Sequence, residues 1–244
     1  MLMKKIIAIL ACGLTFASAA LEENFKKSIK AMADVEVEVE FKKELVSFPS
    51  MYFVIGKTKG GDIFPVIVSK EGEYFIGLSN VLKLSNVDTQ MMQEALNQAQ
   101  KEKEARDSKV LKELFSSFKE SDFLYLQGEG KNLPTKIVVS DPDCPYCREH
   151  LKSINQELKK ANIKMIFAPI HEKEAFVKSQ LIMNEVAKLK KDDTKGKVAL
   201  LNKYFKDITL SDKELKTDFS RITQNTKKIF ESGVIKGVPF IYEE

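Results

Sequence analysis

The sequence predicts a mixed fold of the α+β or α/β class, in which a small β-rich domain, a linker helix and a βαβ domain follow one another. Three observations support this prediction. Short strand-like runs separated by turn residues fill the first third of the chain, a long stretch without Gly or Pro follows, and an apolar strand, a helix and a returning strand come next. The 244 residues suffice for one large or two modest globular domains.

The overall charge gives no reason to expect a nucleic-acid partner. The formal charge of +4 is the small difference between 39 basic and 35 acidic residues, which are spread along the sequence and form no block. The composition, 43% hydrophobic and 30% charged, is that of an ordinary globular protein, and it excludes disordered and fibrous classes.

Residues 1–20 have the pattern of a secretory signal peptide. Two lysines precede the apolar run "IIAILACGLTFASAA", which ends in small residues and gives way to the charged "LEENFKK". We expect cleavage after Ala19 or Ala20 and an exported mature protein, because no later stretch has the roughly 20 apolar residues of a membrane span. An alternative is a lipoprotein anchored through Cys12, since "ILAC" partly resembles a lipoprotein cleavage box.

Residues 21–86 predict a small β-rich domain that opens with the short helix "LEENFKKSIKAMA". In "VEVEVEF" apolar and acidic residues alternate, which is typical of a strand with one buried and one solvent face. The runs "MYFVIG", "IFPVIVS" and "YFIGLS", separated by Gly-containing turns, predict further antiparallel strands. So small a module is marginal alone, and its sheet edges favour pairing with a second copy.

Residues 87–120 predict one long linker helix. The centre, "KEKEARD", is charged on all sides, so we expect it to cross solvent between two domains. The alternative is a surface helix of one continuous domain.

Residues 121–244 predict the βαβ domain. Strand-like "DFLYLQG" and "TKIVVS" precede a helix over residues 146–160, and "IKMIFAPI" predicts the returning strand. A long helical region follows, and "GVIKGVPFIYEE" predicts a turn and a last strand. The domain is therefore a βαβ unit with a largely helical insertion.

Cys144 and Cys147 form a Cys-x-x-Cys pair at a strand-to-helix junction, in "SDPDCPYCREH". A sulfur at a helix N-terminus is stabilised as a thiolate by unpaired N–H groups and the helix dipole. We therefore predict that Cys144 is the nucleophile and that Cys147, one helical turn later, resolves the mixed disulfide. Pro145 suits the first helical turn.

Two alternatives for the pair are an inert structural disulfide and a metal site. An inert structural disulfide would close a loop too short to constrain the unfolded chain much. A Cys2His2 metal site would recruit His150 and His171, the only histidines, but their spacing matches none of the usual zinc patterns. We expect neither a metal nor another cofactor besides the redox-active cysteines.

The motifs "DPDCPYC" and "SGVIKGVPFIY" together resemble the thioredoxin-fold catalytic domain of bacterial periplasmic disulfide isomerases of the DsbC and DsbG type. In that family a signal peptide, an N-terminal dimerisation domain, a linker helix and a thioredoxin domain with a helical insertion follow in this order. The resemblance therefore covers the whole mature chain. It implies a periplasmic homodimer that is paired through residues 21–86 and has a thioredoxin-like domain over residues 121–244.

The resemblance also implies that Pro239 is a cis-proline facing the cysteines. Val238, together with Pro145 and Tyr146, would then form part of the substrate-binding surface. The sequence departs from the family at two points. Isomerases usually carry threonine at the place of Val238, which is more like the DsbA-type oxidases, and the chain stops at Glu244, before a final strand and helix of a thioredoxin fold. We therefore expect an incomplete C-terminal end.

The function that we predict is the isomerisation or reduction of disulfides in exported proteins with cysteines, supported by a membrane thiol reductase or oxidase. A dimeric oxidase is the first alternative, because of Val238. A chaperone for unfolded exported proteins is the second, and reduction of sulfenic acids is a third activity that would use the same Cys144 chemistry. The sequence leaves the direction of the reaction open.

Overall fold

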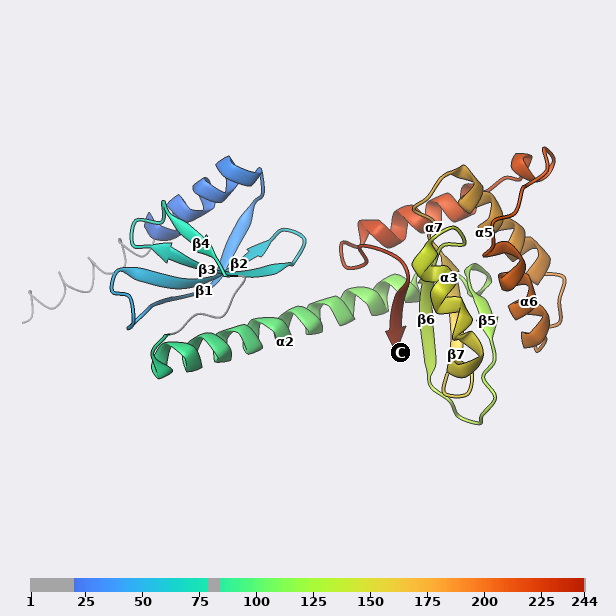
Figure 1. Ribbon diagram of the computed structural model, residues 1–244, viewed down its shortest axis with the longest axis horizontal. Helices are drawn as coiled ribbons and strands as arrows, with labels where there is room; N and C mark the ends of the chain where they lie inside the picture. Colours follow the sequence, from blue (N-terminus) through green and yellow to red (C-terminus); the bar gives the residue numbers. More distant parts are fainter. Residues whose placement is uncertain (1–19, 79–83, 244) are drawn as a thin grey trace, which may run out of the picture. The chain divides into compact units, whose positions relative to one another are not determined.

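A computed structural model describes residues 20–78 and 84–243 of the chain (Figure 1). The predicted signal peptide and Cys12 lie outside the described residues, apart from Ala20. The chain divides into two compact units, Met1–Ser108 and Lys109–Glu244. Among the described helices, none combines the length and the apolar character that a membrane crossing requires.

The sheet of the first unit is an antiparallel meander of four strands in the order β1-β2-β3-β4. The strands are β1 (Val37–Glu44), β2 (Met51–Thr58), β3 (Ile63–Ser69) and β4 (Phe75–Gly77). The prediction of successive antiparallel strands is therefore confirmed. Gly61 and Gly72 have φ values of 86° and 78° in the two turns that flank β3, a conformation that other residues rarely adopt.

Strand β1 differs from the predicted strand with one apolar and one charged face. A shift in the pairing with β2 between Val39 and Phe41 marks a β-bulge, so Phe41 joins a different core cluster from Val37 and Val39. One cluster includes Leu21 and Phe25 of the helix over residues 20–33. The extra residue turns the side chains that follow it to the opposite face, so β1 contributes apolar side chains to both faces of the sheet.

The other face of this sheet is covered by the long helix α2 (Asn86–Ser116). Ala95 and Ala99 are buried among Phe53, Ile55 and Ile67 of the strands. The first half of α2 is thus a packed helix, because small and apolar residues recur on one side of it. The charged centre of α2 is mostly exposed. The last turns of α2 contribute Leu111, Leu114 and Phe115 to a core of the second unit.

The second unit contains a four-stranded sheet in the order β5-β7-β6-β8. The strands are β5 (Leu124–Leu126), β6 (Thr135–Ser140), β7 (Asn162–Phe167) and β8 (Phe240–Glu243). β6 pairs with β7 in parallel, and the other two pairings are antiparallel. This mixed sheet and the helices around it confirm the predicted α+β class and the βαβ unit.

Helices and short 3-10 turns connect these strands. They are η1 (Glu120–Asp122), α3 (Pro145–Lys152), α4 (Ile154–Glu157), α5 (Lys173–Val186), α6 (Thr194–Tyr204), η2 (Glu214–Lys216) and α7 (Ser220–Glu231). The helix predicted over residues 146–160 is therefore divided in two, with a break at Ser153. The Ser153 hydroxyl donates to the His150 carbonyl, and this bond competes with continuation of the helix.

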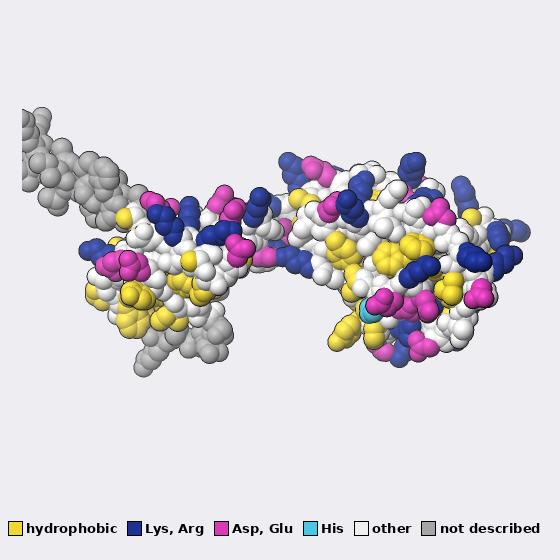
Figure 2. Space-filling model, turned by 90° about the horizontal axis from the view of Figure 1, so that it is seen from above, with side chains coloured by type: hydrophobic (Ala, Val, Ile, Leu, Met, Phe, Trp, Pro, Cys, Tyr) yellow, Lys and Arg dark blue, Asp and Glu magenta, His cyan; other side chains and the backbone are white. Residues whose placement is uncertain are grey.

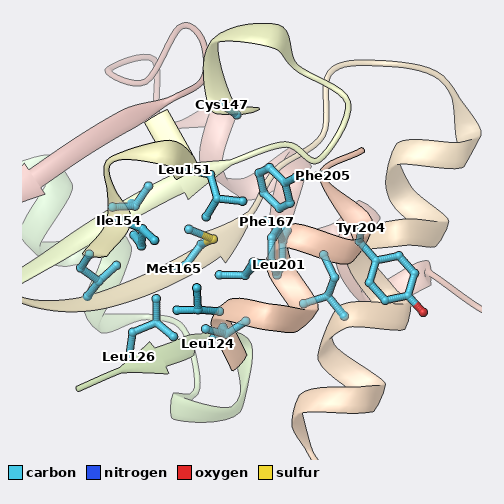
Figure 3. Close-up of a cluster of buried hydrophobic side chains, with 14 of the residues drawn as sticks. Leu124, Leu126, Cys147, Leu151, Ile154, Met165, Phe167, Leu201, Tyr204 and Phe205 are labelled. Atoms are coloured by element: carbon cyan, nitrogen blue, oxygen red, sulfur yellow. The ribbon is translucent and has the colours of Figure 1, made fainter. Parts of the chain in front are cut away.

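Two hydrophobic cores lie on the two faces of the second sheet. The larger core packs β5, β7 and Val138 of β6 against α3, α4, α5 and α6, and Figure 3 shows part of it, including Cys147 and Tyr204. The smaller core packs Ile137, Val139 and Ile166 against the end of α2 and against Ile229 of α7. Because neighbouring residues of β6 point to opposite faces, this strand contributes to both cores.

Candidate active site

The cysteine pair lies where the chain leaves β6 and enters α3. Cys144 is the N-cap residue of α3, with extended backbone angles of φ −73° and ψ 122°, and Pro145 is the first helical residue. Both cysteines are free thiols, and both are buried, Cys144 at 2% and Cys147 at 0% exposure. The sulfur of Cys144 is thus held where a helix N-terminus favours a thiolate.

The two thiols have different surroundings. Burial raises the pKa of the Cys147 thiol to about 12, and the nearby Cys144 contributes in the same direction. The Ser140 hydroxyl and a backbone hydrogen bond from Asp141 oppose this increase only in part. Cys147 therefore stays protonated at neutral pH in the dithiol form, which suits a resolving thiol that reacts second.

Val238 and Pro239 approach the cysteines from the C-terminal end of the chain. The peptide bond between them is cis. The Cys144 thiol donates a hydrogen bond to the Val238 carbonyl oxygen, with Sγ and O 3.6 Å apart. Pairing of Phe240 with Val139 anchors β8 beside β6, so the strand that holds Cys144 also holds the Val-Pro segment.

Pro145 and Tyr146, the residues between the two cysteines, are exposed at the start of α3. The Tyr146 side chain is 76% exposed. An exposed aromatic ring beside a reactive sulfur offers apolar contact area to a bound peptide. The six site residues predicted from the sequence thus lie at the start of α3 and in the Val238–Pro239 segment that contacts it. Their roles stay predictions.

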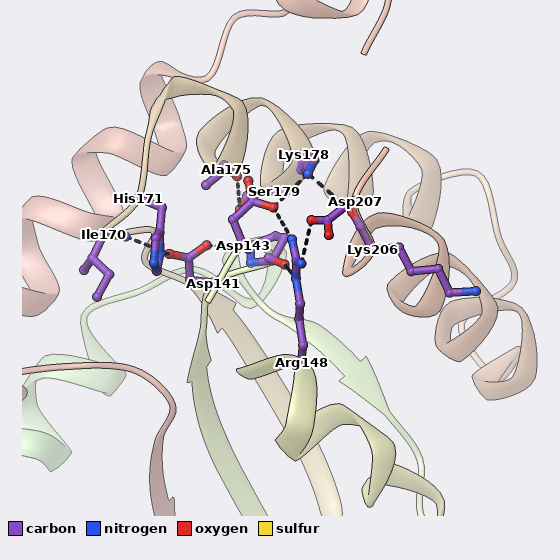
Figure 4. A network of polar contacts seen from close by, with 11 residues as sticks. Asp141, Asp143, Arg148, Ile170, His171, Ala175, Lys178, Ser179, Lys206 and Asp207 are labelled. Carbon is purple, nitrogen blue, oxygen red and sulfur yellow. Dashed lines mark hydrogen bonds and ion pairs between the residues drawn. The ribbon is translucent and has the colours of Figure 1, made fainter. Parts of the chain in front are cut away.

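Asp141 is a buried carboxylate that the sequence prediction missed (Figure 4). Its Oδ2 accepts hydrogen bonds from the Ile170 backbone N–H at 2.9 Å and lies 2.6 Å from His171 Nδ1. Its Oδ1 accepts the Asp143 backbone N–H at 2.9 Å. Asp141 therefore fixes the loop before Cys144 against the loop after β7. The acidic residues of "DPDC" were the available sequence signal.

A second cluster that the prediction missed surrounds Asp143, the residue directly before Cys144. Its Oδ1 accepts hydrogen bonds from Lys178 Nζ at 2.7 Å and from Arg148 Nη2 at 2.8 Å (Figure 4). Lys178 belongs to α5 and is buried, whereas Arg148 belongs to α3. No local pattern indicates this contact, since Asp143 and Lys178 come from separate elements.

The two histidines lie in different polar contacts. His150 Nε2 is 3.0 Å from Glu157 Oε1, and His171 contacts Asp141. Within residues 20–78 and 84–243 no three His, Cys, Asp or Glu side chains form a group that could hold a metal ion. Charged side chains of both signs are interspersed on the visible face of the second unit (Figure 2).

Comparisons with known proteins show which proteins the chain is similar to. The family model for the N-terminal domain of the disulfide isomerase DsbG matches residues 25–111. The structure of Helicobacter pylori DsbG is 26% identical in sequence, with a TM-score of 0.54, and the alignment covers 91% of this chain and 100% of that one. No curated protein sequence shows a significant match to the chain.

Two further structures are less similar. The catalytic domain of Proteus mirabilis ScsC is 16% identical, with a TM-score of 0.44, over 56% of this chain and 85% of that one. The thiol-disulfide exchange protein alpha-DsbA2 from Wolbachia pipientis is 19% identical, with a TM-score of 0.39, over 57% and 87%.

The second unit has a thioredoxin-like fold, and the likeness to DsbG extends over almost the whole chain. These findings define the class of protein, which is a thiol:disulfide oxidoreductase. Within that class, the chain is similar to disulfide isomerases of the DsbG type, through the match of the family model to residues 25–111 and the likeness to Helicobacter pylori DsbG.

Proposed function

We propose that the protein rearranges or reduces disulfides in exported proteins of the periplasm, with Cys144 as the nucleophile and Cys147 as the resolving thiol. The observation that carries this proposal is the position of Cys144. Cys144 is the N-cap residue of α3, and its sulfur contacts the Val238 carbonyl, close in sequence to the exposed Tyr146. A peptide that binds along Val238 and Tyr146 would present its disulfide to this sulfur.

The reaction needs no group besides the two cysteines. The Cys144 thiolate attacks one sulfur of a substrate disulfide, which breaks that S–S bond and releases the other substrate sulfur as a thiolate. If a second substrate thiolate attacks the mixed disulfide, Cys144 is released and no net oxidation occurs, which is isomerisation. If Cys147 loses its proton and attacks Cys144, the substrate leaves with two thiols, and the Cys144–Cys147 pair carries the disulfide.

The second outcome is reduction of the substrate, and it requires a thiol donor to return the pair to the dithiol state. We propose a membrane thiol reductase for this role. The oxidase alternative reverses the same steps and requires an oxidant that renews the disulfide. Trapping the thiols in cells with acid and alkylating them separates the two. A mainly reduced pair supports isomerase or reductase activity, and a mainly oxidised pair supports the oxidase.

We also propose that the protein is a homodimer paired through residues 21–86. The match of the DsbG N-terminal family model to residues 25–111 supports this assignment. The first unit is a four-stranded meander with β1 and β4 at its edges, and an edge strand presents unpaired N–H and C=O groups to a second chain. Sedimentation as a monomer at micromolar concentration would contradict the dimer.

Replacement of each cysteine tests the assigned roles. We expect Cys144→Ser to abolish disulfide exchange with a scrambled substrate, because the attacking sulfur is lost. Cys147→Ser should retain the attack but accumulate a mixed disulfide through Cys144, which is visible on a non-reducing gel and assignable by mass spectrometry. A mixed disulfide through Cys147 in the Cys144→Ser variant, with exchange retained, would show that the roles are reversed.

A further inference from the structure

The ion cluster of Asp143, Lys178 and Arg148 joins a buried lysine to a half-buried carboxylate and a half-buried arginine, an arrangement that the exchange reaction alone does not explain. Two cations contact the same carboxylate oxygen, Asp143 Oδ1, one from α5 and one from α3. The ammonium group of Lys178 belongs to a residue that is only 2% exposed. Placing a charged group in the interior is costly unless an opposite charge or hydrogen bonds compensate it, so the pairing with Asp143 stabilises the buried Lys178 ammonium group.

The same cluster connects the loop before Cys144 to the helical insertion. Arg148 also donates from Nε to the Pro142 carbonyl at 2.9 Å and from Nη1 to Asp207 Oδ1 at 2.7 Å. Lys178 Nζ lies 3.4 Å from the Lys206 carbonyl. Contacts from Arg148 and Lys178 therefore hold the Pro142–Asp143 backbone and the Asp143 carboxylate in one arrangement (Figure 4).

A carboxylate in the residue next to Cys144 opposes formation of the Cys144 thiolate, because like charges repel. In this structure the carboxylate has two cations within hydrogen-bond distance, so its charge is more than compensated. The other carboxylate on Arg148, that of Asp207, is 93% exposed and therefore strongly screened by solvent. Asp141 and His171 are the remaining ionisable pair of this loop, and they contact each other.

We propose that Lys178 is a positioning residue for the thiol chemistry: together with Arg148 it holds and neutralises Asp143, so that this carboxylate does not suppress the Cys144 thiolate. The inference rests on the proposed function, since it takes Cys144 as the nucleophile. Lys178 acts through Asp143 and does not touch the reacting sulfur. Removal of Lys178 should therefore have an effect that depends on the presence of the Asp143 carboxylate.

The experiment measures the alkylation rate of Cys144 at pH 6 in the reduced full chain, with the modified residue assigned by mass spectrometry. We expect Lys178→Met to lower the rate about 3- to 10-fold, because Asp143 then keeps only one cation. Asp143→Asn should raise the rate by a similar factor. The double variant should return to within about 2-fold of the unaltered protein, because neither the carboxylate nor its buried partner remains.

Lys197→Met is the matched control. Lys197 is also a buried lysine of the second unit, but in the part of the chain that the structure describes its ammonium group donates to the backbone carbonyls of Tyr125 and Lys191 and not to Asp143. Its replacement should lower stability and leave the alkylation rate of Cys144 unchanged. A purely structural role for Lys178 would give the same result as this control, with a lower melting temperature and no change in rate.

An unchanged rate in folded Lys178→Met, or a lower rate in Asp143→Asn, would overturn the inference. Lys178→Met leaves the Asp143 carboxylate paired with Arg148, so it buries no unpaired charge and provides the test even if Asp143→Asn does not fold. Failure of the proposed function has a different signature. If Cys147 is alkylated faster than Cys144 in the unaltered protein, the assigned nucleophile is wrong, whatever the variants show.

Discussion

The sulfur of Cys144 lies 3.6 Å from the carbonyl oxygen of Val238, although the two residues are 94 positions apart in the chain. This contact favours the protonated thiol, because a thiol can donate to a carbonyl whereas a thiolate faces the negative end of its dipole. The helix N-terminus at Cys144 has the opposite effect. The balance between these two influences determines how readily the pair gives up its electrons.

Val238→Thr should shift this balance towards the dithiol form. A threonine hydroxyl beside the sulfur can donate a hydrogen bond to the thiolate, which stabilises it by about 1 kcal/mol. We expect the equilibrium with reduced and oxidised glutathione to move towards the dithiol by about 3- to 10-fold. Val234→Thr, a similar change at another half-buried position, is the control. A shift towards the disulfide, or an equal shift in the control, would refute the prediction.

Gly56→Ala should destabilise the first sheet. Gly56 of β2 pairs with Phe64 of β3, and the Phe64 ring covers the place where a Cβ atom at residue 56 would lie. Overpacking of this kind costs about 1–3 kcal/mol in free energy of unfolding. Gly77→Ala on β4 is the matched control, because a Cβ atom there meets no other atom within 4 Å.

Hydrogen exchange of the β2 amides at increasing urea concentrations measures the effect of both glycine replacements on the stability of the sheet. We expect weaker protection in Gly56→Ala and little change in Gly77→Ala. Equal protection in the two variants would mean that the Phe64 ring moves aside without loss of packing.

Asp88 should make the stability of the first unit dependent on pH. It is buried near the start of α2, and its carboxylate accepts hydrogen bonds from the backbone N–H groups of Val46 and Ser47 and from the Ser85 hydroxyl. Burial by itself would raise the pKa of Asp88, but these hydrogen bonds outweigh it and lower the pKa to about 2. The carboxylate therefore contributes stability above about pH 4, and this contribution is lost as the pH falls towards 2.

Asp88→Asn tests this dependence. We expect it to reduce the free energy of unfolding by about 1–2 kcal/mol at pH 7, and the difference from the unaltered protein should shrink between pH 4 and pH 2. Asp34→Asn is the control, because Asp34 forms an exposed ion pair with Lys30 at the end of the first helix. A difference for Asp88→Asn that stays constant down to pH 2 would contradict the assigned pKa.

Local patterns in the sequence were sufficient to predict the elements that hold the site. The apolar run before Cys144 forms β6, and Pro145 begins α3. Proline suits the first position of a helix, where the backbone N–H that it lacks would have no partner within the helix. Strands β2, β3 and β4 of the first unit could also be predicted, since Gly-containing turns separate them.

Other features depend on contacts between distant segments, and local patterns do not encode them. The bulge before Phe41 is set by the pairing of β1 with β2 and by the two helices that cover the sheet. The pairing of Lys178 with Asp143 requires α5 to pack beside the loop after β6. Both residues resemble ordinary surface charges in the sequence, because the burial of Lys178 beside Asp143 arises only in the folded second unit.

The pairing of β8 with β6 has a consequence for the order in which the site forms. Neighbouring hairpins such as those of the first sheet close short loops, whereas the contact of Val238 with Cys144 closes a loop of 94 positions. Long loops cost more entropy to close and form later during folding. On this basis the two thiols acquire their mature reactivity late in folding, after the β6-α3-β7 scaffold has formed around them.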